Sequence, residues 1–500
     1  MKKILLSILL SLPLILSAQL KCGLELTSKQ ASKVFQYRSD LQDKLVSSRT
    51  VLTDNLITIP VKVYLISDEA GTYQYSYSDL FTQMCELNDH YNKVGFYFYL
   101  LPDIEVIKDD RFIQLDPKKP TFYQGDIMNW FGNLMMFHYH YGALNVYYTR
   151  GTGLCGMGPF PFMAPQMMGK TGILMEGNKQ CSGPGSMTLA HELGHHFDLL
   201  HTFQGWDTKD TMQSEYVTRT PGIANCSFAG DGFCDTPADL LNFDCPYIGN
   251  DVDMKNMRYN PDVSLIMSYH ADRCQNKFSN SEISHMRTVI QTDTARVHYL
   301  GHQINEFSKP TPGALLLPNH QEVVPYDNPV TFSWEPSANA QAYYLKIFDF
   351  GGNIKHEALI YDSTVYHYEF GYNNRGKSLY WTIAPINFHQ PCLIYSDTQN
   401  FKIATKATSL INYETIKFKT YPNPTQFGQR LHIVADRLSD NSEQVQVKVV
   451  GINGQLIQSE AIQFNGNKAE LNLDENIVPG LYFIYYETGN QVYQSKVMIQ

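Results

Sequence analysis

The stretch HELGHHFDLLH, residues 191–201, constrains this chain more than any other. Each residue of an α-helix turns about 100°, so His191 and His195 lie on one face and can direct two imidazole nitrogens at a single metal ion. Glu192 lies one step further round, where its carboxylate can act on a water at the metal without binding the metal itself. His201 can reach the same ion only if the helix ends soon after His195 and the chain turns back.

The spacing of these residues resembles the zinc motif His-Glu-x-x-His-x-x-Gly-x-x-His of the metzincin metalloproteases. This chain has Asp198 where the motif usually has glycine. The turn at that point typically needs a left-handed backbone, which glycine adopts freely and aspartate only with strain. The alternative is an amphipathic core helix with hydrogen-bonded histidines, which is disfavoured because this set of residues rarely takes these spacings by chance. We therefore predict zinc as the cofactor, bound by His191, His195 and His201.

The N-terminus and the overall composition indicate export. Residues 1–18, MKKILLSILLSLPLILSA, combine a basic start, a short apolar run and a small-residue end, which is typical of a secretory signal cut near Ala18 or Gln19. No later stretch approaches about 18 consecutive apolar residues, so we predict no transmembrane segment. The formal net charge is −10 and no stretch forms a basic stripe, so nucleic-acid binding is disfavoured. The length of 500 residues suggests about three domains.

Nine cysteines in an exported chain predict disulfides with one thiol left over. Cys22, close to the predicted cut, is the expected odd one. A thiolate is a good zinc ligand, and a segment that places one on a catalytic zinc would displace water and hold an enzyme latent. Residues 19–54 would then form a propeptide, helical around 28–45; the alternative is that Cys22 has no such role. The sequence leaves open the pairing of Cys85, Cys155, Cys181 and Cys392.

Residues 55–306 have the pattern of an α/β domain. Alternation over 57–65 predicts a half-buried strand with Thr58, Lys62 and Tyr64 on its polar face. Ser78 resembles the N-cap of a following helix. Further alternating runs precede the metal helix, an order expected of a sheet whose edge strand holds an extended peptide over the metal.

A second group of motifs comes after the metal helix. The Cys-Asp-Thr-Pro run at 234–237 and the segment LIMSYHADRC, with Met267 and Tyr269, resemble the pappalysin family over roughly residues 55–305. This resemblance implies that Met267 forms a hydrophobic base beneath the metal and that Tyr269 stabilises an oxyanion; the alternative for Tyr269 is a core position. It also implies two crossed disulfides, whereas spacing alone leaves three pairings open. The crossed pairs would be Cys226–Cys245 and Cys234–Cys274.

The same resemblance bears on calcium and on substrate choice. Some pappalysin relatives bind calcium near the Asp-Thr-Pro loop, and Asp231, Asp235 and Thr236 offer the oxygen ligands that calcium prefers. The alternative is a solvated acidic loop. Relatives that cut before basic residues carry an acidic group after the Met-turn, but Asp272 here is followed directly by Arg273, so the sequence predicts no specificity.

The last third of the chain is all-β in pattern. A Pro- and Gly-rich linker at 307–313 precedes residues 314–405, which resemble a bacterial fibronectin type III-like sandwich that serves as a spacer or binds substrate or glycan. Residues 414–500, with YPNPT and PGLYFIYY, resemble the C-terminal sorting domain of type IX secretion cargo. That resemblance implies that the type IX machinery takes the chain from the periplasm across the outer membrane, and that it is then released or attached at the cell surface.

The predicted fold is thus an α/β (α+β) metzincin-like catalytic domain followed by two all-β sandwich domains. We predict a secreted zinc endopeptidase, made as a zymogen, in which Glu192 acts as general base on a water that attacks protein or peptide substrates. One alternative is an exported binding or adhesion protein with an inactive or structural metal site. Another is a zinc hydrolase for a different bond, which the Met-turn and the cysteine pattern disfavour.

Overall fold

The computed structural model describes most of the chain after the predicted signal peptide, 1–18, which lies outside the described residues. The described ranges are 22–23, 26–48, 55–71, 74–113, 127–207, 212–300, 304, 308–406, 418–426, 428–435, 444–452, 454–474, 477–488 and 491–500. These residues form two compact units, one within 1–54, 63–75 and 104–300 and the other within 55–62, 76–103 and 301–500. No helix in the described ranges is both long and apolar enough to cross a membrane.

A six-stranded sheet organises the N-terminal part of the fold. Its order is β2-β1-β4-β6-β5, and β3 also pairs with β1. Strand β1 is parallel to β2 and β3, and β4 is parallel to β6, whereas the short edge strand β5 is antiparallel to β6. The bounds are β1 (Ile57–Ser67), β2 (Phe96–Leu100), β3 (Glu105–Lys108), β4 (Leu144–Thr149), β5 (Gly156–Met157) and β6 (Gly172–Glu176).

Strand β1 is present where the sequence predicts it, but its predicted polar face is buried. Lys62 and Tyr64 are 4% and 2% exposed. The Tyr64 ring stacks on Tyr147 of β4 with 4.6 Å between centroids, and the Lys62 amine reaches the carboxylate of Asp103 at 2.6 Å. The half-buried prediction was wrong because β1 is an inner strand of a largely parallel sheet, in which both faces are covered.

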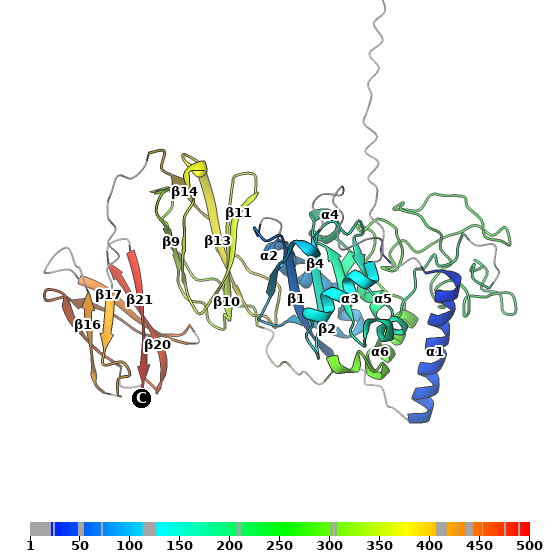
Figure 1. The fold of residues 1–500 in the computed structure, drawn as a ribbon, viewed down its shortest axis with the longest axis horizontal. Coiled ribbons are helices and arrows are strands. Elements are labelled where there is room, and N and C mark those ends of the chain that lie inside the picture. Colours follow the sequence, from blue (N-terminus) through cyan, green and yellow to red (C-terminus); the bar gives the residue numbers. More distant parts are fainter. Residues whose placement is uncertain are drawn as a thin grey trace, which may run out of the picture. The chain divides into compact units, whose positions relative to one another are not determined.

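Six helices accompany this sheet in the described residues: α1 (Ser28–Ser48), α2 (Tyr77–Tyr91), α3 (Ile127–Phe137), α4 (Lys179–Ser182), α5 (Thr188–His196) and α6 (Asn280–Thr292). The propeptide helix predicted around 28–45 is α1, which lies beside α6 in Figure 1. The N-cap of α2 is Ser76 rather than the predicted Ser78, because the Ser76 hydroxyl accepts a hydrogen bond from the Ser78 N–H at 3.2 Å. Short 3-10 turns cover Asn92–Val94, Asp110–Phe112, Pro161–Met167, Val297–Tyr299 and Tyr372–Asn374.

A β-sandwich comes next in the chain, with Trp334 and Trp381 buried in one core shared by its two sheets. The sheets have the orders β11-β10-β13-β14-β8 and β12-β9-β7. A disulfide joins Cys85 of α2 to Cys392 after β13, so this unit extends across the boundary predicted near 306. The strands are β7 (Leu315–Leu317), β8 (Glu322–Val324), β9 (Val330–Trp334), β10 (Ala342–Phe348), β11 (Ile354–Tyr361), β12 (Val365–Tyr368), β13 (Ser378–Ile386) and β14 (Gln399–Ile403).

The C-terminal region is a second, smaller sandwich around its own core, which includes Leu431, Val447 and Ile484. Its sheets have the orders β15-β16-β19 and β18-β17-β20-β21. The predicted fold class, an α/β region followed by two all-β sandwiches, is therefore confirmed. The strands are β15 (Phe418–Tyr421), β16 (Arg430–Ala435), β17 (Gln444–Gly451), β18 (Leu456–Gln463), β19 (Lys468–Asn472), β20 (Gly480–Thr488) and β21 (Gln491–Ile499).

Candidate metalloprotease active site

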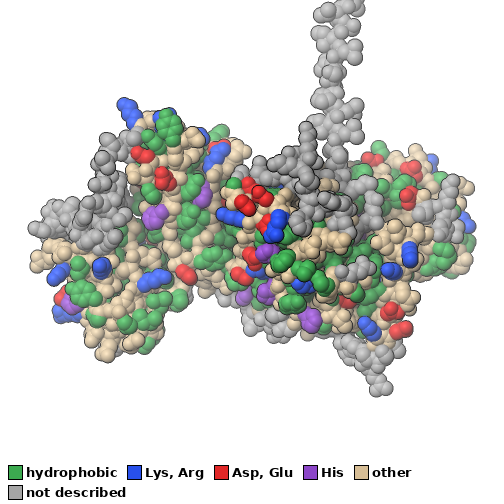
Figure 2. All heavy atoms as spheres, viewed as in Figure 1, with side chains coloured by type: hydrophobic (Ala, Val, Ile, Leu, Met, Phe, Trp, Pro, Cys, Tyr) green, Lys and Arg blue, Asp and Glu red, His purple; other side chains and the backbone are tan. Residues whose placement is uncertain are grey.

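Surface charge does not mark a functional site on the face seen in Figure 2, where acidic and basic side chains are interspersed with hydrophobic ones. Buried polar groups are more informative, because a polar side chain loses its water on burial and needs a partner in exchange. One such group surrounds the C-terminal end of helix α5. Its members include His191, Glu192, His195 and His201, which are all at most 6% exposed.

Helix α5 ends at His196, and the chain then turns back as the histidine spacing requires. Asp198 adopts φ 71°, the left-handed conformation that glycine usually supplies at this point. The turn is closed by hydrogen bonds from the Asp198 N–H to the His195 carbonyl and from the Leu199 N–H to the Gly194 carbonyl, both 2.9 Å. Aspartate therefore replaces glycine without losing the turn that returns His201 to the helix.

The three histidines converge through their Nε2 atoms. His201 Nε2 lies 3.1 Å from that of His191 and 3.0 Å from that of His195. The Nδ1 atoms of His191 and His195 lie 2.8 and 2.7 Å from the carbonyls of Ile266 and Leu199, so Nδ1 carries the proton and Nε2 presents its lone pair.

These rings are neutral, which decides what the cluster can hold. Burial lowers the pKa of His191 to about 4 and those of His195 and His201 well below the usual value. Lone pairs about 3 Å apart repel each other unless a cation lies between them, and tetrahedral zinc would separate its nitrogens by about 3.3 Å. The histidines therefore fit the predicted zinc ion.

Cys22 completes this cluster from the N-terminal segment. Its Sγ and the ligand nitrogens of His191, His195 and His201 all lie within 4.8 Å of one another, the one such group of potential metal ligands found in the described ranges. The other eight cysteines form disulfides, so Cys22 keeps its thiol. The next residue, Gly23, donates its N–H to the carbonyl of Gly156 in β5 at 2.8 Å. The segment thus occupies the edge strand predicted to hold a peptide.

Glu192 is fully buried beside the histidines. Its Oε2 accepts a hydrogen bond from the Cys22 thiol at 3.4 Å, and its Oε1 has no hydrogen-bond partner. Burial raises the pKa of the Glu192 carboxyl to about 8. The strand end at Gly158 approaches so closely that a Cβ there would lie 1.9 Å from the Glu192 carbonyl. The glutamate is therefore held in a dry, tightly packed position.

Met267 and Tyr269 both lie next to the cluster. Met267 is fully buried under α5, where a Cβ on Gly194 would lie 2.2 Å from the Met267 sulfur. The Tyr269 ring centre lies 4.8 Å from that of His201, and its hydroxyl accepts a hydrogen bond from the Cys22 N–H at 3.1 Å. Met267 thus packs against the helix that carries His191 and His195, and Tyr269 packs against His201.

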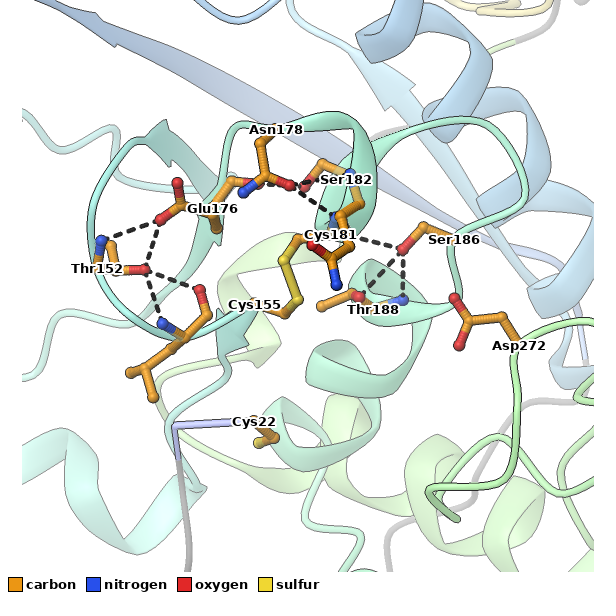
Figure 3. The surroundings of a disulfide bond; sticks show 12 residues. Cys22, Thr152, Cys155, Glu176, Asn178, Cys181, Ser182, Ser186, Thr188 and Asp272 are labelled. Atoms are coloured by element: carbon orange, nitrogen blue, oxygen red, sulfur yellow. Dashed lines mark hydrogen bonds between the residues drawn. A yellow bond between two sulfur atoms is a disulfide. The ribbon is translucent and has the colours of Figure 1, made fainter. Parts of the chain in front are cut away.

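A cavity of about 280 Å³ opens next to Glu192 and Tyr269. Asp272 lines it, and the Asp272 carboxylate accepts a hydrogen bond from the Met187 N–H at 3.3 Å. Figure 3 shows Asp272 near the segment of Ser186 and Thr188 that precedes and begins α5, with the Cys155–Cys181 disulfide close by. The remaining lining includes Gln180, Phe243, His270 and Gln275.

Arg273 does not neutralise Asp272 in this cavity. Its guanidinium points elsewhere and donates to the Cys245 carbonyl at 2.8 Å. The adjacent opposite charges that prevented a specificity prediction are thus separated in the fold. This separation could not be predicted from the residue types, because they do not indicate the backbone direction at a turn, which decides where neighbouring side chains point.

The predicted calcium residues are only partly brought together. Asp231 Oδ1 accepts from Thr236 Oγ1 at 3.1 Å, whereas the Asp235 carboxylate caps α6 by accepting from the Ser279 hydroxyl and the Ser281 N–H. Two buried carboxylate oxygens, Asp231 Oδ2 and Glu215 Oε2, have no hydrogen-bond partner. Burial raises the pKa of Asp231 to about 7, and burial with the nearby Asp231 charge raises that of Glu215 to about 9. Orphaned carboxylate oxygens fit a hard cation.

The predicted crossed disulfides, Cys226–Cys245 and Cys234–Cys274, are wrong. The structure pairs Cys226 with Cys234 and Cys245 with Cys274. Successive turns between 225 and 232 fold the chain back, which brings the Cα atoms of Cys226 and Cys234 to 5.0 Å. Hydrogen bonds from Arg273 to the Cys245 carbonyl and between His270 and the Asp244 carbonyl hold the second pair of segments together.

Comparison with known proteins identifies two regions. Residues 171–291 match the family described as pregnancy-associated plasma protein-A, and residues 419–500 match the secretion system C-terminal sorting domain. Both resemblances predicted from the sequence, to pappalysins and to sorting domains, are thereby confirmed. With such a sorting domain and extracellular relatives, the chain is a secreted or cell-surface protein.

The similar proteins include extracellular metalloproteases. An extracellular metalloprotease of Colletotrichum graminicola is 30% identical over 158 residues, covering 29% of this chain and 48% of that protein. Pappalysin-1 of Homo sapiens is 24% identical over 197 residues, covering 39% and 11%. A solved promirolysin mutant from Tannerella forsythia is 18% identical with a TM-score of 0.42, covering 56% of this chain and 97% of that chain. This chain spans less than half the length of the two sequence relatives.

Proposed function

We propose that this chain, whose residues 171–291 belong to the pappalysin-type metalloproteases, is a zinc endopeptidase made as a latent zymogen. The observation that carries the proposal is the convergence of three neutral histidine nitrogens beside the buried, partly unpartnered carboxylate of Glu192. A ligand set with an acid–base group poised next to it is what hydrolysis needs. The family match disfavours a zinc hydrolase for another bond type.

In this proposal His191, His195 and His201 hold zinc, which supplies a Lewis acid that polarises the peptide carbonyl and acidifies a water. Glu192 takes a proton from the water as the water oxygen attacks the carbonyl carbon. The carbon–nitrogen bond then breaks, and Glu192 returns the proton to the leaving nitrogen.

Tyr269 would support the same step by donating a hydrogen bond to the developing oxyanion. Burial raises the pKa of its phenol well above the usual value, so the hydroxyl keeps its proton. A substrate would lie along β5 and pair with Gly156 as Gly23 does here. The edge strand would thereby place the bond to be cut beside Glu192.

The prosegment, residues 19–54, would block this arrangement at two points. The Cys22 thiol lies among the metal ligands and donates to Glu192, while the Cys22 backbone N–H occupies the Tyr269 hydroxyl. One residue, Cys22, is therefore hydrogen-bonded to both Glu192 and Tyr269, the two groups that would act on substrate. Removing the segment would free them together.

The cavity next to Glu192 supports a preference for a basic side chain after the cut bond. Asp272 brings a carboxylate to this cavity, and Arg273 does not pair with it. A cationic side chain in a partly dehydrated pocket gains from such a partner. Asp272→Asn should lower kcat/KM for lysine or arginine at that position about tenfold to hundredfold, while changing cleavage before leucine little. Equal losses on all peptides would remove Asp272 from specificity.

Calcium binding is proposed at the loop of Asp231 and Thr236, with Glu215 rather than Asp235 as the further carboxylate. The support is the pair of buried oxygens on Asp231 and Glu215 that no hydrogen bond satisfies. A divalent cation would neutralise both. Chelation with a calcium-selective reagent should lower the thermal unfolding midpoint, and an unchanged midpoint would refute the site.

One observation favours a second candidate, a structural zinc site in a binding or adhesion protein. With Cys22 included, the described cluster offers four protein ligands, which is how structural zinc sites are usually closed. The two candidates predict different outcomes when the prosegment is removed. A catalytic site keeps zinc on three histidines and gains proteolysis, whereas a structural site loses zinc and stability.

The test is to cut the purified full-length chain between residues 48 and 55 with a limiting amount of an added protease, which is then inhibited. Casein cleavage and bound zinc are measured before and after the cut. We expect casein cleavage to appear with zinc retained. Loss of zinc without cleavage would support the structural candidate and contradict the endopeptidase.

A further inference from the structure

A second polar cluster lies where helix α1 meets the turn of the histidine motif. Its centre is Arg38 of α1, whose side chain is 13% exposed, against Asp198, whose side chain is completely buried. The zinc ligands do not take part in it. The cluster therefore requires an explanation beyond metal binding.

The Arg38 guanidinium makes three hydrogen bonds with groups of the protease region. Its Nε donates to the Asp198 carboxylate at 3.1 Å, one terminal nitrogen donates to the Asp198 carbonyl at 2.7 Å, and the other donates to the Asp231 carbonyl at 2.7 Å. The Phe233 ring lies below the guanidinium carbon, 4.6 Å away. The carboxylate and the two carbonyls accept hydrogen bonds from the guanidinium nitrogens, and the aromatic ring packs against the flat face of the guanidinium. This set of partners suits an arginine.

The loop opposite α1 is shaped for this contact. Gly232 has φ 85°, and a Cβ there would lie 2.6 Å from an Arg38 nitrogen and 2.7 Å from the Phe35 ring. Any side chain at this position would displace the Arg38 guanidinium or the Phe35 ring. The neighbouring residue on the helix, Tyr37, donates its hydroxyl to Asp293 at 2.8 Å, so two successive residues of α1 are hydrogen-bonded to the protease region.

The Asp198 carboxylate also has a partner within the protease region. His285 of α6 lies 2.9 Å from the same carboxylate oxygen that Arg38 contacts. The other oxygen, Oδ1, is buried and has no hydrogen-bond partner. Without Arg38 this carboxylate would keep only a histidine, which is a costly arrangement for a fully buried charge.

We propose that Asp198, the Asp231 carbonyl and the Phe233 ring form a guanidinium-binding site that Arg38 occupies, and that this site fastens helix α1 to the protease region. The inference rests on the proposed function only in treating α1 as part of a prosegment. It explains why aspartate stands where the motif usually has glycine: its backbone makes the turn and its carboxylate receives the arginine. The anchor is separate from Cys22, so the segment is held at two points.

The test measures amide hydrogen exchange of residues 28–48 in the full-length chain. Every sample carries Glu192→Ala, which keeps the chain intact whether or not it can process itself. The variants are Arg38→Ala, Arg38→Lys and Asp198→Asn, and Lys29→Gln at an exposed position of α1 is the matched control for loss of one charge. Exchange in α3 serves as the internal reference for intact folding.

We expect Arg38→Ala to speed exchange across α1 about tenfold to hundredfold with α3 unchanged, and Arg38→Lys to recover only part of the protection. Asp198→Asn should speed exchange less than Arg38→Ala, because the two carbonyl contacts and the Phe233 ring remain, and adding it to Arg38→Ala should change exchange little further. Millimolar methylguanidinium should restore protection to Arg38→Ala, whereas methylammonium should not.

Exchange in Arg38→Ala equal to that in Lys29→Gln would overturn the proposal, as would equal rescue by both cations. If Arg38→Ala lost protection throughout the chain, α3 included, Arg38→Lys would decide the question. Intermediate protection of α1 in Arg38→Lys would support the site, and wild-type protection would refute it. The readout needs no enzymatic activity. A failed cleavage assay would therefore count against the endopeptidase and leave this result standing.

Discussion

The Sγ atom of Cys22 lies 3.4 Å from Oε2 of Glu192 and within 4.8 Å of the ligand nitrogens of three histidines. One thiol thus contacts both the proposed acid–base group and the proposed metal site. In the proposed zymogen, latency and catalysis would depend on the same few atoms, and a single substitution would separate them.

Replacing Cys22 by alanine should shorten the lag before proteolysis about tenfold or more, because one contact of roughly 1.4 kcal/mol with the closed site is lost. The lag is measured with a fluorogenic casein substrate on freshly purified full-length protein. Ser32→Ala, at an exposed position on α1, is the matched control. An unchanged lag in Cys22→Ala would remove the thiol from latency.

Gly158 offers a test of how tightly the Glu192 segment is packed. Alanine at Gly158 would bring a Cβ to 1.9 Å from the Glu192 carbonyl, and a backbone atom cannot rotate away. We expect a loss of about 2 kcal/mol or more in the free energy of unfolding, with reduced zinc binding. Gly132→Ala in α3, where no atom lies within 4 Å, should be neutral or stabilising by up to about 1 kcal/mol. Equal thermal unfolding midpoints for the two variants would contradict this packing.

Stability should depend on pH through three buried carboxyls. Burial is the main cause that raises the pKa values of Glu215, Asp231 and Glu282, to about 9, 7 and 8. Their folded-state pKa values exceed those of the unfolded chain near 4, so the folded state binds more protons between about pH 4 and 9. Above about pH 6.5, where the buried histidines are neutral in both the folded and the unfolded chain, the free energy of unfolding without calcium should therefore fall as pH rises, by up to about 1.4 kcal/mol per pH unit for each carboxyl that still holds its proton.

Calcium should reverse this trend, because a cation favours the ionised carboxylates. The unfolding midpoint is followed by circular dichroism at pH 5 and pH 8, with calcium or with a calcium-selective chelator. The stabilisation by calcium should be larger at pH 8 than at pH 5. Calcium stabilisation that is equal at both pH values would contradict protonation of these carboxyls in the metal-free state.

Deleting residues 414–500 should leave the protein in the periplasm, since the matched sorting domain covers 419–500. Cell fractionation followed by immunoblotting measures the distribution. A deletion of 314–405 that keeps the sorting domain is the control for shortening the chain. Normal export of the protein that lacks 414–500 would refute the role of the sorting domain in this chain.

The parts of this fold that were predictable are those fixed by local spacing. The distances between His191, His195 and His201 along the chain require a helix followed by a turn, and the structure has both. The burial of Tyr64 was not predictable in the same way, because it depends on which strands and helices lie beside β1. Local alternation carries no information about distant neighbours.

Three features of the structure were not predicted, and the cause is the same for each. Contacts between distant segments are set by the direction of the backbone. The pairing of Cys226 with Cys234 results from a run of turns, and the separation of Asp272 from Arg273 results from the path of one loop. Arg38 had no signal as a functional residue, since its partners are more than 150 positions away. Asp198 did carry such a signal, because an aspartate at a position that is usually glycine needs a partner for its carboxylate.

The most direct test of the endopeptidase is digestion of a mixed peptide library by the processed protein, beside the same preparation of Glu192→Ala, with bound zinc quantified in both. We predict equal zinc in the two proteins, cuts that disappear on chelation, and a rate at least about 100-fold lower in Glu192→Ala. Stoichiometric zinc with no cuts by either protein, or cuts that persist in Glu192→Ala, would contradict the proposed mechanism.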